Sequence, residues 1–270
     1  MVKKPYFLFL SMIMFVLIMS GCSKNDPSTK PEDTKQDSLN EKVELTVSAA
    51  ASLQDSLNEI TTAFEDENPN VKINYNFGAS GSLQQQIFQG APVDLFFSAA
   101  EDKFDQLVEE GLIEKENEID LLGNEIVLVV PKDSDKGITS FEDIGKAVKI
   151  SIGTPESVPA GKYAKETLEN LNIWKSIEGK MVFAKDVRQV LTYVETGNVD
   201  AGIVYKTDAL VSSKVNIVAT AEENTHAAII YPVGIIKSSS HIKEAKLFYE
   251  YLQNKESKKT FEKYGFKGLN

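Results

Sequence analysis

Small and hydroxyl-bearing residues occur at four points where a strand pattern in the sequence gives way to a helix pattern. Ser52 precedes the first of these helices and is expected to cap it, and the run GASGS at 78–82 precedes the second. Pro159 suits the first turn of the third helix, and Asp186 is expected to cap the fourth. The first N–H groups of a helix have no partner within it and lie at the positive end of its dipole. Four such helix ends predict a site for an anion.

The elements that must position these residues alternate between strand and helix along the chain. Strict alternation of apolar and polar residues marks strands such as 71–77, and apolar residues three or four apart mark the helices. This order predicts an α/β fold whose sheets are mostly parallel and flanked by helices. Helix N-termini gather at the carboxyl ends of such strands. Tyr205 directly follows the apolar strand 201–204, so its hydroxyl is expected at the same edge.

The pattern is interrupted near Gly123 and resumes afterwards, which predicts two lobes. We assign 43–124 to the first lobe, 125–232 to the second lobe, and 233–270 to a return into the first. Ligands drawn from both lobes imply a binding cleft between them and closure about the two crossovers.

The N-terminal residues predict export and lipid attachment. Lys3 and Lys4 precede an apolar run at 6–19 that is too short to cross a membrane comfortably and ends before Cys22, the single cysteine of the chain. We interpret 1–21 as a lipoprotein signal peptide and Cys22 as the site of acylation, for example by palmitate. The polar stretch 22–42 is expected to be a disordered tether, so the protein is placed on the extracytoplasmic face of the cell membrane.

Charge and composition exclude several classes of protein. Without the two lysines of the signal peptide, 27 basic residues face 40 acidic ones, a net charge of −13 that disfavours nucleic acid. The two histidines, His226 and His241, lie far from the serine motifs, and 78–82 lacks the final glycine of a nucleophile elbow. A single cysteine allows no internal disulfide and no cysteine-based metal site. We therefore expect neither an enzyme nor a resident cofactor.

Six ordered motifs, spread over residues 43–268, resemble the periplasmic molybdate-binding proteins of ABC importers. The motifs are VSAAASL at 47–53, FGASGSL at 77–83, GAPVDLFFSA at 90–99, VPAGKYA at 158–164, KDVR at 185–188 and AGIVY at 201–205. The resemblance implies a two-lobed periplasmic-binding-protein fold of the type II-like class. It also implies a monomer that delivers molybdate or tungstate to a permease and ATPase complex.

The resemblance further implies five ligands to the oxyanion. The hydroxyls of Ser52, Ser80 and Tyr205 and the backbone N–H groups of Ala160 and Val187 would hold the ion, so a metal would bind only as its oxyanion. The glycines at 78 and 81 leave Ser82 as the alternative to Ser80. Arg188, beside Val187, is expected to form a structural ion pair instead of contacting the ion.

A site of this composition offers hydrogen-bond donors and no carboxylate acceptor. A protonated anion such as hydrogen phosphate would leave its O–H unpaired, which costs roughly 1–3 kcal/mol in a buried site. A fully deprotonated tetrahedral anion fits. Sulfate or another tetrahedral or organic anion bound on the same frame is the alternative to molybdate or tungstate.

Overall fold

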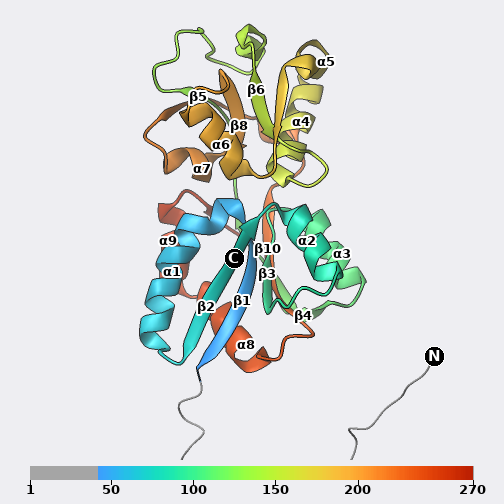
Figure 1. Ribbon diagram of the computed structural model, residues 1–270, viewed down its shortest axis with the longest axis vertical. Helices are drawn as coiled ribbons and strands as arrows, with labels where there is room; N and C mark the ends of the chain where they lie inside the picture. The colour runs from blue at the N-terminus through green and yellow to red at the C-terminus, as the bar shows by residue number, and fades with distance from the viewer. Residues whose placement is uncertain (1–41, 270) are drawn as a thin grey trace, which may run out of the picture. The chain divides into compact units, whose positions relative to one another are not determined.

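The computed structural model describes residues 42–269, and the polypeptide there forms two lobes, each built on one mixed sheet with helices against it (Figure 1). The signal-peptide, Cys22 and most of the tether predictions lie outside the described residues. None of the helices within 42–269 is long and apolar enough to cross a membrane.

The sheet of the first lobe has six strands in the order β11-β4-β10-β3-β1-β2. Strands β1, β2 and β3 run parallel, as their alternation with helices predicted, whereas β10 pairs antiparallel to both β3 and β4. The strands are β1 (Val43–Ala50), β2 (Val71–Gly78), β3 (Leu95–Phe97), β4 (Ile113–Gly123), β10 (Ile230–Ile236) and β11 (Lys267–Gly268).

Helices cover this first sheet with two apolar clusters. Leu83, Phe96 and Phe104 belong to a small cluster beneath α2 and α3, and Phe64 contacts Phe248 edge-on at 4.9 Å where α1 meets α8 in the larger one. The helices of this lobe are α1 (Gln54–Glu67), α2 (Ser80–Phe88), α3 (Glu101–Glu109), α8 (Ile242–Leu252) and α9 (Lys255–Lys263), with the 3₁₀ turn η1 (Ala51–Leu53) before α1.

The sheet of the second lobe has five strands in the order β7-β6-β8-β5-β9, with β5 antiparallel to both of its neighbours. Its strands are β5 (Ile126–Pro131), β6 (Ile150–Gly153), β7 (Met181–Ala184), β8 (Ala201–Tyr205) and β9 (Val215–Thr220). The helices are α4 (Pro159–Asn170), α5 (Trp174–Ile177), α6 (Val187–Glu195) and α7 (Lys206–Leu210), with 3₁₀ turns η2 (Glu142–Lys146), η3 (Glu178–Lys180) and η4 (Glu223–Thr225).

Two segments join the lobes, one between β4 and β5 and the other leading into β10. Residues 230–232, which the sequence analysis assigned to the second lobe, already pair with β4 in the first sheet. Both sheets are mixed, with antiparallel pairings at least as frequent as parallel ones, because each receives strands from the crossing segments beside its β-α-β core.

Local sequence accounts for the helices that matter to the site, and α6 is the clearest case. Val187, Val190, Leu191 and Val194 recur at helical spacing and are all buried. Asp186 caps the helix as predicted, its carboxylate accepting a hydrogen bond of 2.8 Å from the N–H of Gln189. The backbone of Gly197 has a φ of 66°, which ends the helix in the left-handed conformation that glycine adopts without strain.

Candidate functional site

The carboxyl ends of strands from both sheets, and the helix N-termini that follow them, surround a small cavity between the lobes. Its volume is about 10 Å³, far below the size of pockets for sugars or peptides. Twelve residues line it, none of them charged: Ala50, Ala51, Ser52, Gly78, Ala79, Ser80, Ala99, Val158, Pro159, Ala160, Val187 and Tyr205.

All five residues proposed as ligands line this cavity. Ser52 lies in η1, and Ser80 is the first residue of α2. From the second lobe, Ala160 and Val187 lie in the first turns of α4 and α6, and Tyr205 ends β8. Each of the five is at most 4% exposed.

Ser80 and not Ser82 faces the cavity. The side chain of Ser80 is fully buried, and its Oγ accepts a hydrogen bond of 2.9 Å from the N–H of Ala99. Ser82, by contrast, is exposed and lies along a separate polar groove. Because the Ser80 oxygen already accepts a bond from a backbone donor, its own hydrogen is free to point at a guest.

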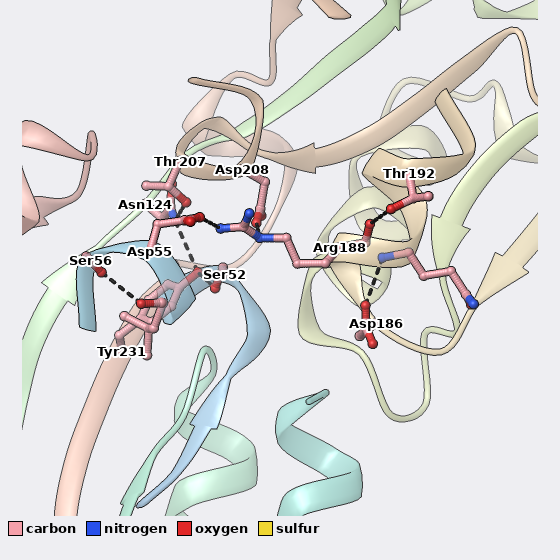
Figure 2. Close-up of polar contacts among 12 residues, drawn as sticks. Ser52, Asp55, Ser56, Asn124, Asp186, Arg188, Thr192, Thr207, Asp208 and Tyr231 are labelled. Atoms are coloured by element: carbon pink, nitrogen blue, oxygen red, sulfur yellow. Dashed lines mark hydrogen bonds and ion pairs between the residues drawn. The ribbon is translucent and has the colours of Figure 1, made fainter. Parts of the chain in front are cut away.

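The prediction that Ser52 caps the first helix was wrong. The 3₁₀ turn η1 comes between β1 and α1, so that Leu53 occupies the cap position and no side chain caps the helix. The Ser52 Oγ instead lies 2.9 Å from the hydroxyl of Tyr231 on β10 (Figure 2). Its hydroxyl is therefore not used to satisfy the backbone of α1.

Tyr205 provides a neutral hydroxyl at the junction of the lobes. Burial, with smaller contributions from nearby tyrosines and Asp208, raises the pKa of Tyr205 well above its ordinary value of 10, so it keeps its proton. The hydroxyl donates to the carbonyl oxygen of Ala99 across a long distance of 3.3 Å. A bond of this length is weak, so little free energy opposes its transfer to a better acceptor.

Two glycines allow backbone segments to approach one another at this site. A Cβ on Gly161 would lie 2.0 Å from the carbonyl oxygen of Gly153, so only glycine lets the start of α4 pack against the end of β6. A Cβ on Gly81 would lie 2.8 Å from the carbonyl oxygen of Ser157 in the other lobe, to which the Gly81 N–H donates a bond of 3.0 Å. The first contact positions the Ala160 N–H, and the second joins the lobes.

Arg188 forms ion pairs next to the cavity, as predicted from the sequence. It contacts Asp55 on α1, and its Nε lies 2.6 Å from Oδ1 of Asp208 on α7, a fully buried carboxylate (Figure 2). Arg188 does not line the cavity. Its charge is thus balanced by two carboxylates, and the anion site keeps its uncharged lining.

Three polar residues that lie behind the site were not predicted from the sequence. Tyr231, Asn124 and Thr207 are buried and joined by hydrogen bonds to each other and to Ser52. The only local signal was a tyrosine within an otherwise apolar strand, since a buried tyrosine hydroxyl usually has a partner. Among residues 42–269, no group of three or more histidine, cysteine and acidic side chains is arranged to hold a metal ion.

Comparison with known proteins places the chain among transport proteins. The family model described as bacterial extracellular solute-binding protein matches residues 45–267. A Bacillus subtilis protein, provisionally named an ABC transporter substrate-binding lipoprotein, is 56% identical over 97% of this chain and 98% of its own. The molybdate-binding protein of Escherichia coli is 37% identical over 82% of this chain and 88% of its own.

Solved structures agree with the two-lobed fold. The substrate-binding domain of a protein described as a molybdenum ABC transporter from Clostridium difficile has a TM-score of 0.66 and 44% identity, covering 85% of this chain and all of that domain. The sulfate-binding protein of Mycobacterium tuberculosis has a TM-score of 0.74 over 84% of this chain and 88% of its own. At 17% identity, the second comparison speaks for the fold alone.

Proposed function

The chain belongs to the family of bacterial extracellular solute-binding proteins and is the substrate-binding component of an ABC transporter, and on that premise we propose that its solute is molybdate or tungstate. The observation that carries the proposal is the lining of the cavity, which offers hydroxyl and backbone donors but no charged group. The molybdate-binding relative from Escherichia coli and the solved molybdenum-transporter domain support the same choice.

Helix dipoles favour a bound anion that keeps its full charge at neutral pH. Helices α2, α4 and α6 begin at the cavity, so their unpaired N–H groups and dipoles favour an anion there. None of the side chains that line the cavity is a carboxylate that could accept the proton of hydrogen phosphate. Molybdate and tungstate carry no proton that would need an acceptor.

Sulfate is the competitor that this donor set does not exclude, because it is also a fully deprotonated tetrahedral dianion. The size of the closed cavity must separate it from the larger oxyanions. We propose that the protein holds the ion without converting it and passes it to the permease and ATPase, working at the membrane surface through a lipid on Cys22.

Elemental analysis and ligand-induced stabilisation test this function. Purified protein should carry molybdenum or tungsten, and ligand-free protein should bind either anion in a calorimeter. A ligand at a thousandfold excess over Kd stabilises the folded state by about 4 kcal/mol, which for a chain of this size raises Tm by roughly 10 °C. Phosphate should have almost no effect, and the shift by molybdate should persist in moderate salt because the site is closed.

The outcomes distinguish an error in the proposed solute from an error in the proposed function. A large shift with sulfate and none with molybdate would replace the proposed solute while retaining an oxyanion-binding protein. If ligand-free protein responds to no oxyanion at all, the proposed function is wrong.

A further inference from the structure

Tyr231 lies behind Ser52 on the side away from the cavity. It is on β10, the strand by which the chain returns to the first sheet, and its side chain is fully buried. Its hydroxyl lies between two partners, 2.9 Å from the Oγ of Ser52 and 3.1 Å from the Nδ2 of Asn124 (Figure 2). Tyr231 does not line the cavity, so it can affect the guest only through residues that do, which are Ser52 by its hydrogen bond and Tyr205 by an edge-on ring contact with centroids 5.6 Å apart.

The orientation of the Asn124 amide determines the direction of these bonds. Its Oδ1 accepts a hydrogen bond of 2.8 Å from the N–H of Glu125, which can only donate. The Nδ2 therefore faces the other way and donates twice, to the Oγ1 of Thr207 at 3.0 Å and to the hydroxyl oxygen of Tyr231. With the amide in this orientation, the Tyr231 oxygen is an acceptor.

A tyrosine hydroxyl has one hydrogen, which the Ser52 oxygen at 2.9 Å can accept and the Asn124 amide nitrogen cannot. Burial raises the pKa of Tyr231 well above its ordinary value of 10, so this hydrogen stays on the oxygen at neutral pH. The Ser52 oxygen then accepts the hydrogen bond from Tyr231. The hydrogen of the Ser52 hydroxyl is not used in this bond. It is left to point into the cavity.

We propose that Tyr231 is a positioning and specificity-determining residue, which makes the Ser52 hydroxyl an obligatory donor to the bound oxyanion. Asn124 donates to Tyr231, Tyr231 donates to Ser52, and Ser52 donates to the guest. This inference rests on the proposed function and deepens it. A hydroxyl that is held as a donor binds a deprotonated anion and rejects one that would present an O–H at the same place.

The same hydrogen bonds link the site to the hinge. Asn124 lies in the first crossing segment, between β4 and β5, Tyr231 lies in β10 at the second crossover, and Thr207 belongs to α7 of the second lobe. The orientation of Ser52 therefore depends on residues that meet only when both crossing segments and the second lobe are in place. A network that is complete in this way favours a single hydrogen-bond direction over its reverse.

A double-mutant cycle with molybdate as the probe tests whether Tyr231 acts through Ser52. Calorimetry would compare the wild type, Tyr231→Phe, Ser52→Ala and the double variant. Loss of one neutral hydrogen bond from the network should weaken molybdate binding by Tyr231→Phe about three- to tenfold. In the Ser52→Ala background the same change should have no further effect, because the residue through which Tyr231 acts is gone.

Selectivity gives a second measurement that a purely structural role would not change. In Tyr231→Phe the Ser52 hydroxyl can rotate and accept, so the ratio of molybdate affinity to phosphate affinity should fall. Tyr75→Phe is the control, because Tyr75 is a partly buried tyrosine of the same lobe whose hydroxyl bonds to Thr61 away from the cavity. It should lower Tm while leaving both affinities unchanged.

Three results would overturn the inference. Equal losses from Tyr231→Phe with and without Ser52 would show that Tyr231 supports the fold and not the orientation of Ser52. Unchanged molybdate affinity and unchanged selectivity in Tyr231→Phe would show that Ser52 needs no such partner. A wild type that binds none of molybdate, tungstate and sulfate would overturn the proposed function and this inference together, an outcome distinct from the first two.

Discussion

Asp55 on α1 of the first lobe and Arg188 on α6 of the second lobe form an ion pair across the boundary between the lobes (Figure 2). Arg188 immediately follows Val187, which lines the cavity, so this pair lies next to the proposed anion site. The pair can form only when the lobes approach, because its two members belong to different lobes. It therefore adds a free energy term that favours the closed form.

Asp55→Asn should weaken molybdate binding without unfolding the protein. The Asp55 side chain is 40% exposed, and solvent-screened pairs contribute at most about 1 kcal/mol, so we expect a loss of no more than about fivefold. The loss arises because the population of the binding-competent closed form falls. Asp66→Asn on the same helix is the control and should bind as the wild type does. Equal affinity of the Asp55 variant and the wild type in low salt would rule out this contribution.

Removing any one hydroxyl of the site should weaken molybdate binding. Ser52→Ala, Ser80→Ala and Tyr205→Phe each delete one donor to a charged guest, worth about 1.5–3 kcal/mol, and should weaken molybdate binding roughly ten- to a hundredfold or somewhat more. Ser82→Ala is the control for Ser80, because Ser82 is exposed and outside the cavity. Calorimetric titration of the four variants checks the set.

Gly81→Ala should oppose closure of the lobes. The added methyl group would lie 2.8 Å from the carbonyl oxygen of Ser157 in the other lobe, and both atoms belong to or adjoin the backbone. The lobes must separate to relieve this contact, so we expect molybdate binding at least tenfold weaker with little change in the Tm of the ligand-free protein. Gly145→Ala is the control, because its new Cβ would meet no atom within 4 Å and the residue does not line the cavity. Wild-type affinity in Gly81→Ala would show that the Gly81–Ser157 contact is not needed for binding.

The pH dependence of stability should contain a contribution from Asp208. Burial, opposed by the attraction of Arg188, raises the pKa of Asp208 from 3.8 to about 6 in the folded protein. Between these values the folded state holds a proton that the unfolded state has released. The free energy of unfolding must therefore fall as pH rises from about 4 to 6, and the contribution is constant above that range.

Asp208→Asn isolates this contribution because the amide has the same size and does not titrate. The free energy of unfolding of the wild type minus that of the variant should decrease by about 2 kcal/mol from pH 4 to pH 6. Denaturant titrations at several pH values measure the difference and cancel the other groups. A difference that instead grows with pH would mean that Arg188 outweighs burial and lowers the pKa.

Cys22→Ser should release the protein from the membrane. A single cysteine after an apolar run provides the thiol that would be acylated, and serine cannot form the thioether. Cell fractionation should find the wild type with membranes and the variant in the soluble fraction or held as an uncleaved precursor. The lipid-anchor prediction fails if both proteins remain on the membrane to the same extent after processing.

Much of the secondary structure could be predicted from local sequence patterns. Helix α6 forms over the residues that its apolar spacing and Asp186 predicted, and the parallel pairing of β1, β2 and β3 follows from their alternation with helices. Strands β4 and β9 were not predicted. The sequence of β4, IEKENEIDLLG, shows no regular alternation, because its central residues are partly exposed and its place in the sheet comes from pairing with β10 and β11.

The sequence by itself determined that uncharged helix N-termini and hydroxyls would meet at one edge of the fold, because capping, strand alternation and helix spacing are properties of neighbouring residues. Only the tertiary structure decided how those hydroxyls are used. Ser52 meets Tyr231 across 179 residues of chain, and Arg188 meets Asp55 across 133. Hydrogen-bond direction and ion pairing depend on which groups are brought together after burial, and no local pattern encodes the partner that a folded chain brings from so far away.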